Sequence, residues 1–168
     1  MKARALILIM VLMLVFACKQ SGAERSGNQV FQPSELGEFE RKVLEDGDHE
    51  AYESLQTYYM DRPSEEFLKF ARVMAEDYHY VKAYRDLFEI IVARDGCSYD
   101  YNLECLSEET RSTALVYFKK AVMMGDQVSS TILLEYYVEN KTLPIKELYE
   151  NEALVLKAKQ NIAPKNEK

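Results

Sequence analysis

The sequence predicts an all-α protein, built as a short α-solenoid of about three helix pairs with a C-terminal capping helix. Two observations predict this fold class. From residue 35 to residue 161, apolar residues recur at steps of three and four, and no turn-bounded stretch alternates as a strand would. In addition, one part of this region repeats another part without a gap. Because one helix pair cannot bury its own apolar face, we expect repeated pairs to stack.

Residues that start and stop helices divide the region into segments. The expected helices are 35–46, 48–60, 63–76, 79–94, 108–124, 127–139 and 144–161. Residues suited to helix starts are Ser34, Pro63, Ser107 and Pro144. Glycines suited to helix ends are Gly47, Gly96 and Gly125.

The internal repeat aligns residues 39–59 with residues 117–137. Identical pairs are Lys42 with Lys120, Gly47 with Gly125, Asp48 with Asp126, Leu55 with Leu133, Tyr58 with Tyr136 and Tyr59 with Tyr137. We align a weaker third copy by placing Phe67 on Tyr117, which matches Ala71 with Ala121. The two good copies are 78 residues apart. Half of that distance, about 39 residues, suits a helix-pair repeat.

The second good copy resembles a Sel1-like repeat, a relative of the tetratricopeptide repeat. The residues that carry the resemblance are Tyr117, Lys119, Lys120, Ala121, Gly125, Asp126, Ser129, Leu133 and Tyr137. The chain departs from the family at Gln56 and Leu134, where a glycine normally follows the leucine, and in an insertion around residues 97–105. The resemblance covers roughly residues 35–140. It implies a right-handed α-solenoid over 34–162, with a polar tail at 163–168.

The N-terminus has the features of an export signal. Lys2 and Arg4 precede an apolar run over residues 5–17, which is too short to span a bilayer comfortably. Residues 15–18 (VFAC) resemble a bacterial lipobox, which implies removal of residues 1–17 and lipidation of Cys18. The alternative is an ordinary secretory signal cut after Ala17. Residues 18–33 are mostly polar, so we expect a flexible tether there.

Location and charge restrict the partners. The several acyl chains that the lipobox resemblance implies would anchor the protein stably to a membrane. Lys19 follows Cys18 in place of the Asp that favours inner-membrane retention, so the resemblance implies the outer membrane, facing the periplasm. Loss of Lys2 and Arg4 with the signal changes the formal net charge from −7 to −9. Such an acidic balance disfavours nucleic-acid binding, which requires clustered Lys and Arg.

The other two cysteines are Cys97 and Cys105, and an exported protein is free to form disulfides. A bond between them would close a short loop and stabilise the fold by about 2.5 kcal/mol. Two free thiols or a metal site are the alternatives. The spacing matches no zinc pattern, because no second Cys or His pair accompanies it.

The sequence contains no recognisable catalytic or cofactor-binding motif. It lacks G-x-S-x-G, a phosphate-binding glycine loop, H-E-x-x-H and C-x-x-C. The histidines, His49 and His79, fall on different predicted helices, and we interpret both as surface or helix-end residues. We therefore expect no catalytic residue, no metal and no cofactor.

Tyrosine is the enriched aromatic residue, with 12 Tyr and no Trp. Most are expected to pack between helices, whereas Tyr78, Tyr80, Tyr99 and Tyr101 are hard to bury together and are candidates for a partner-binding rim. The sequence therefore predicts a non-catalytic adaptor or scaffold that binds a protein partner. The alternatives are an immunity protein that neutralises a periplasm-delivered toxin, a role in which exported Sel1-like proteins are found, and an enzyme with an unrecognised site.

Overall fold

The computed structural model describes residues 33–59, 65–94, 97, 101, 103–139 and 145–163. The chain divides into two units, Met1–Phe31 and Gln32–Lys168, and every described residue belongs to the second. The predicted signal peptide (1–17), the tether up to residue 32 and Cys18 therefore lie outside the described residues. Pro63, Gly96, Tyr99 and Pro144 do so as well.

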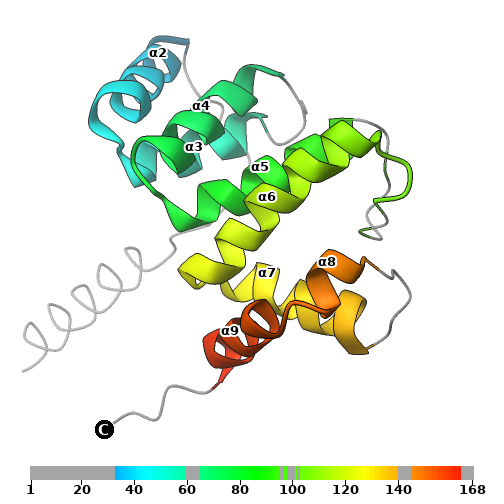
Figure 1. The fold of residues 1–168 in the computed structure, drawn as a ribbon. Coiled ribbons are helices and arrows are strands. Elements are labelled where there is room, and N and C mark those ends of the chain that lie inside the picture. Colours follow the sequence, from blue (N-terminus) through cyan, green and yellow to red (C-terminus); the bar gives the residue numbers. More distant parts are fainter. Residues whose placement is uncertain are drawn as a thin grey trace, which may run out of the picture. The chain divides into compact units, whose positions relative to one another are not determined.

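The described residues form helices and no strand, which confirms the all-α class (Figure 1). The elements are α2 (Pro33–Arg41), η1 (Lys42–Asp46), α3 (His49–Tyr59), α4 (Glu65–Glu76), α5 (Val81–Arg94), α6 (Glu108–Met124), α7 (Gln127–Ile132), η2 (Leu133–Glu139), α8 (Lys146–Tyr149) and α9 (Glu152–Ile162). η1 and η2 are widened π-helical turns that continue α2 and α7. In the described part of the chain, no helix has the length and apolar character needed to cross a membrane.

Two boundaries differ from the prediction. The segment predicted as one helix over 144–161 is broken into α8 and α9, because the Asn151 side chain accepts a hydrogen bond of 3.0 Å from the backbone N–H of Leu154 and starts a new helix. The capping element is thus two helices. Ser34 does not precede the first helix, since α2 already begins at Pro33.

The other described boundary residues act as predicted. Gly47 and Gly125 end their helices in the left-handed region, with φ of 63° and 102°. The aspartate after each glycine caps the next helix: Asp48 Oδ1 accepts from the N–H of Ala51 at 2.9 Å, and Asp126 Oδ1 from that of Ser129 at 2.7 Å. Ser107 caps α6 by accepting from Thr110 N–H at 3.2 Å.

Helices that follow each other in the chain pack against each other from α2 to α7, and α9 then covers α6, α7 and η2. η1 also contacts α4, and α8 contacts η2 and α9. The core lies between these layers and includes the fully buried side chains Tyr52, Phe70, Phe88, Phe118, Leu133 and Tyr137. Burial of this apolar surface is the main stabilising contribution to the fold.

The second helix of each pair buries one repeated ladder of side chains. The three ladders are Ala51, Leu55 and Tyr59 on α3; Ala83, Leu87 and Ile91 on α5; and Ser129, Leu133 and Tyr137 on α7 and η2. In each ladder the small residue stands four positions before a leucine that is 0% exposed. The copy on α5 has little identity to the others, so the sequence comparison missed it.

The predicted alignment of the third copy is wrong by three residues. Buried positions on α4 are Phe67, Phe70, Ala71, Met74 and Ala75, and those on α6 are Ala114, Tyr117, Phe118, Ala121 and Val122, with Leu115 buried in addition. Their spacing matches when Phe67 is placed on Ala114 rather than on Tyr117. Apolar positions recur about once per helical turn. An alignment that is shifted by one turn therefore matches the apolar pattern almost equally well, and the pattern alone does not determine the register.

This register also corrects the repeat length. The ladder on α5 follows that on α3 by 32 residues, and the ladder on α7 follows that on α5 by 46 residues. The first interval is therefore shorter than about 39 residues and the second is longer, and the insertion around residues 97–105 lies within the second.

Gly47→Ala is expected to lower the free energy of unfolding by about 1–2 kcal/mol or more, because an L residue is strained in the left-handed region. The ring of Tyr78 also occupies the place that the new Cβ would take. Gly37→Ala is the matched control, since Gly37 lies in α2 with open space around it, and we expect a gain of about 0.5–1 kcal/mol. Urea unfolding measures both changes, and equal effects would contradict the strained position of Gly47.

Candidate functional site

A buried carboxylate joins the first two helix pairs. Asp86 on α5 is 2% exposed, and its Oδ2 accepts hydrogen bonds from Tyr52 Oη at 2.8 Å and from Lys82 Nζ at 2.9 Å. Lys82 also donates to the side-chain oxygen of Gln56 on α3. Its ammonium lies 5.4 Å from the centre of the Tyr52 ring. These contacts hold α3 against α5.

The residue before Asp86, Arg85, joins the second pair to the third. Its Nη1 lies 3.1 Å from Asp126 Oδ2, and its Nε lies 3.8 Å from both Asp86 Oδ1 and Glu89 Oε1. Asp126 also caps α7, so one carboxylate starts α7 and pairs with Arg85 on α5. We name the five residues Tyr52, Lys82, Arg85, Asp86 and Asp126 the polar spine.

Burial governs ionisation in and beside the polar spine. Loss of solvent raises the pKa of Tyr52 far above its usual range, and the neighbouring Asp86 charge adds to this rise. Partial loss of solvent also raises the pKa of Glu89, whose side chain is 44% exposed, against the opposing effect of Arg85. A tyrosine of this kind stays protonated and donates to Asp86. The polar spine therefore places no activated nucleophile beside a base, and its geometry suits positioning of helices.

Two of the predicted rim tyrosines contact the first helix pair. The Tyr78 ring lies over Gly47, and its hydroxyl donates to the carbonyl of Leu44 at 3.3 Å. Tyr80 stacks on His49 with ring centres 3.9 Å apart and donates to Glu53 Oε1 at 2.9 Å. Burial raises the pKa of Tyr80 to about 12.

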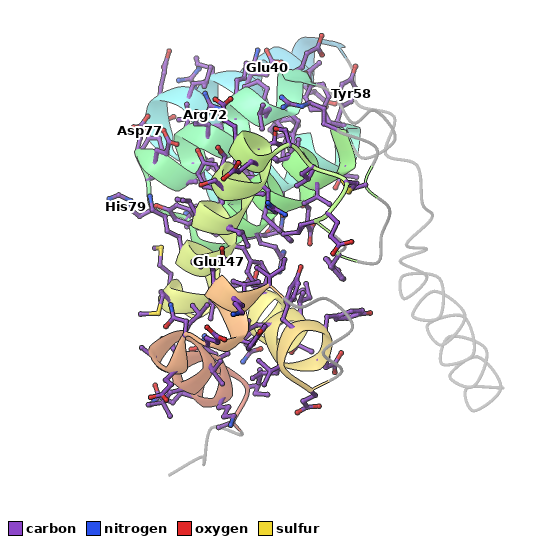
Figure 2. The ribbon with its side chains drawn as sticks, turned by 45° about the vertical axis from the view of Figure 1, so that its right-hand side comes forward. Glu40, Tyr58, Arg72, Asp77, His79 and Glu147 are labelled. Carbon is purple, nitrogen blue, oxygen red and sulfur yellow. A yellow bond between two sulfur atoms is a disulfide. The ribbon has the colours of Figure 1, made fainter. Side chains whose placement is uncertain are left out.

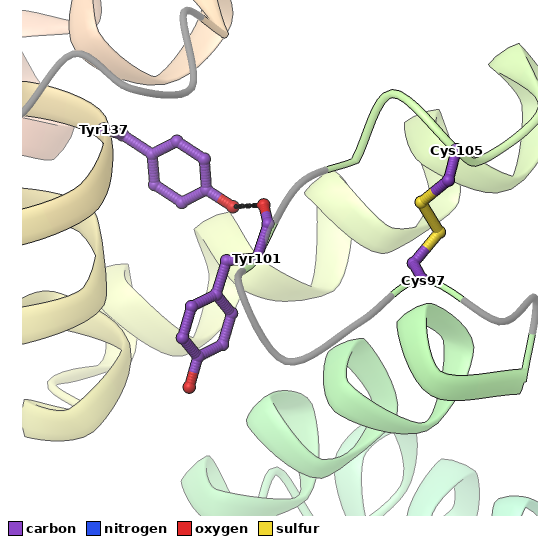
Figure 3. Close-up of a disulfide and its surroundings, with 4 residues drawn as sticks. All are labelled: Cys97, Tyr101, Cys105 and Tyr137. Carbon is purple, nitrogen blue, oxygen red and sulfur yellow. Dashed lines mark hydrogen bonds between the residues drawn. A yellow bond between two sulfur atoms is a disulfide. The ribbon is translucent and has the colours of Figure 1, made fainter.

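Tyr101 lies elsewhere, at the junction of α5 and η2. Its ring lies 6.5 Å from that of Phe88 and 5.1 Å from that of Tyr136, and its carbonyl accepts from Tyr137 Oη at 2.8 Å (Figure 3). The predicted rim thus falls into two places among the described residues, with Tyr78 and Tyr80 at one and Tyr101 at the other. Tyr99 lies outside them. All three described rim tyrosines make internal contacts.

Cys97 and Cys105 form a disulfide whose Cα atoms are 5.8 Å apart, a usual separation for the bond (Figure 3). Cys97 is buried, Cys105 is exposed, and both belong to the insertion that carries Tyr101. The bond closes the insertion beside the Tyr101 and Tyr137 contact.

We expect Cys97 and Cys105 to resist alkylation in unfolded, non-reduced protein and to react after reduction. Cys97→Ser should lower the free energy of unfolding by about 1–3 kcal/mol, because the closed loop restricts the unfolded chain. Mass spectrometry of the alkylated protein and urea unfolding measure the two effects. Free thiols in protein purified without reductant would contradict the disulfide.

Sequence reasoning missed an apolar surface on α6. Val116, Met123 and Met124 are 51%, 51% and 40% exposed, and Val128 at the start of α7 is 48% exposed. The first three lie at i, i+7 and i+8, so they follow one side of the helix. Comparison of the outward positions in the three repeat copies shows this surface once the burial of each helix fixes the register.

Other candidate sites are weaker. No group of three His, Cys, Asp or Glu suited to a metal ion occurs in the ranges that the structure describes. A shallow, open hollow beside α8 is lined by Lys146, Glu147, Glu150 and Asn151. His79, between α4 and α5, and Glu147, on α8, come from different elements of the fold (Figure 2). His79 has a φ of 54° in the connection between α4 and α5, and His49 stacks on Tyr80.

Comparison with known proteins gives no relative from which to transfer a function. No family model matches the sequence, and no curated protein and no solved structure is a significant match.

Proposed function

We propose that the chain is a non-catalytic lipoprotein of the outer membrane, facing the periplasm, that binds a protein partner through a helical-repeat surface. The observation that carries this proposal is the ladder that recurs on α3, α5 and α7. Helix pairs that share one ladder and pack in chain order suit a right-handed α-solenoid of the Sel1-like or tetratricopeptide-like kind. Such arrays use extended concave surfaces for binding.

The contacts of the polar spine support a binding role. Its charged groups make the contacts that hold three helix pairs together. Asp86 accepts a hydrogen bond from Tyr52, and Arg85 pairs with Asp126. The rest of the helix surface is held on a rigid set of helices. This rigidity lowers the conformational entropy that is lost when a partner binds.

Partner binding is tested by crosslinking cells that naturally make the protein and purifying the tagged full-length chain from the envelope. We expect one protein to co-purify in constant proportion. If that partner is a toxin encoded by a neighbouring gene, the chain acts as an immunity protein. Absence of any specific partner, together with substrate turnover by the pure protein, would contradict the proposal.

The anchor has its own prediction. Wild-type protein should partition with membranes and incorporate a fatty-acid analogue, and Cys18→Ser should lose the label, because the thiol is the site of acylation. Cys105→Ser is a control that leaves Cys18 in place and should remain labelled. Unlabelled wild-type protein that is soluble after export would contradict lipidation.

A further inference from the structure

The apolar surface of α6 is not required by the repeat fold. In the first copy, the positions equivalent to Val116, Met123 and Met124 are held by Glu38, Glu45 and Asp46. In the second copy, with the register found above, they are held by Lys69, Glu76 and Asp77. All six of these charged residues are exposed. The third copy therefore carries apolar side chains where the other copies meet water.

Two lysines on α6 have also lost the carboxylates that pair with their equivalents. In the first copy, Arg41 Nη1 lies 2.9 Å from Glu45 and Lys42 Nζ lies 3.0 Å from Glu38. Lys119 and Lys120 are the equivalent residues, and the positions of those two glutamates are held by Met123 and Val116. Neither lysine has a carboxylate partner within the described part of the chain, although Lys120 lies 5.4 Å from the Tyr84 ring centre.

We name Val116, Lys119, Lys120, Met123 and Met124 the α6 stripe. It is basic and apolar on a domain whose predicted mature net charge is −9 once Lys2 and Arg4 are removed from a chain of −7. The half-exposed side chains of Val116, Met123 and Met124 favour a partner that removes them from water, and methionine adapts well to such surfaces. The unpaired lysines favour carboxylates at the edge of that contact.

We propose that the α6 stripe docks an acidic, amphipathic segment of a protein partner, whose apolar side chains cover Val116 and Met123 and whose carboxylates pair with Lys119 and Lys120. This docking restores, between two chains, the pairs that the first copy makes within one helix. The inference rests on the proposed partner-binding function and names the surface and the chemistry of the partner.

A photoreactive residue tests the site in living cells that make the full-length chain. Placed at Met123 it should crosslink to a protein, and the crosslinked peptide should contain both apolar and acidic residues. Placed at Glu45, the equivalent position of the first copy, it should give little product. Crosslinks of equal yield at both positions, to phospholipid only, or to a second copy of this chain would overturn the proposal.

The double variant Val116→Glu with Met123→Glu separates docking from folding. It reproduces the sequence pattern of the first copy, so it should unfold at the same urea concentration as wild type and weaken partner recovery at least about tenfold. Lys119→Glu with Lys120→Glu should weaken recovery similarly. If either variant folds and recovers the partner at the wild-type level, the α6 stripe is not the docking site. In that case the proposal that the chain binds a partner would still stand. If the wild-type chain formed no crosslink to any protein, both the partner-binding proposal and the docking proposal would be wrong.

Discussion

Asp86→Ala is expected to lower the free energy of unfolding by about 3–5 kcal/mol, because it removes one member of a buried charged network. Tyr52 and Lys82 would both lose the oxygen to which they donate, and Arg85 would lose a neighbouring charge. Chemical unfolding followed by circular dichroism measures the change. Asp86→Asn should cost less, since its amide oxygen still accepts a hydrogen bond.

The matched control for Asp86 is a carboxylate on the surface. Glu45→Ala also removes an ion-pair partner, but its side chain is 63% exposed, so the loss should stay below about 1 kcal/mol. Equal losses for the two variants would mean that Asp86 does not hold the helix pairs together.

Leu133→Ala is expected to cost about 2–5 kcal/mol through lost burial and the cavity that remains. Leu55→Ala and Leu87→Ala should each fall in the same range, because all three leucines are 0% exposed and hold one position in the three ladders. The same unfolding measurement applies to each variant.

Leu156→Ala serves as the control for the ladder, since Leu156 is 59% exposed on α9 and should change stability by less than about 0.5 kcal/mol. The Leu87 result carries the most information, because only the structure places that residue in a repeat. A change within about 0.5 kcal/mol at Leu87 would show that the second ladder is misassigned.

The starts and ends of helices that depend on residues close in sequence could be predicted from the sequence. The ends of helices at Gly47 and Gly125 and the starts after Asp126 and Ser107 depend on residues within one turn, so they could be identified without a structure. The break at Asn151 was missed because the apolar period continues across it, although its capping side chain was visible in the sequence.

Contacts between helices could not be predicted in the same way. The hydrogen bond from Tyr52 to Asp86 joins residues 34 positions apart, and the pair of Arg85 with Asp126 spans 41 positions. Nothing in the local pattern distinguishes Asp86, which is buried, from an aspartate in solvent. The tyrosines illustrate the same limit, because Tyr78 and Tyr101 contact Gly47 and Phe88, which the count of tyrosines does not indicate.

The α6 stripe could be predicted from the sequence only in part. Its residues could be read from the sequence, but their meaning depends on the comparison of Val116 with Glu38 and of Met123 with Glu45. That comparison becomes informative once the burial of each helix fixes the register and the ion pairs of the first copy are known.

The central claim, that this chain binds a protein partner, is tested most directly by a titration with purified components. The co-purified protein is added to the purified chain, and binding is followed by calorimetry. We predict saturable binding of one partner per chain with a dissociation constant in the micromolar range or tighter, about −8 kcal/mol or more favourable. A titration that shows no saturation with both proteins folded would contradict the claim.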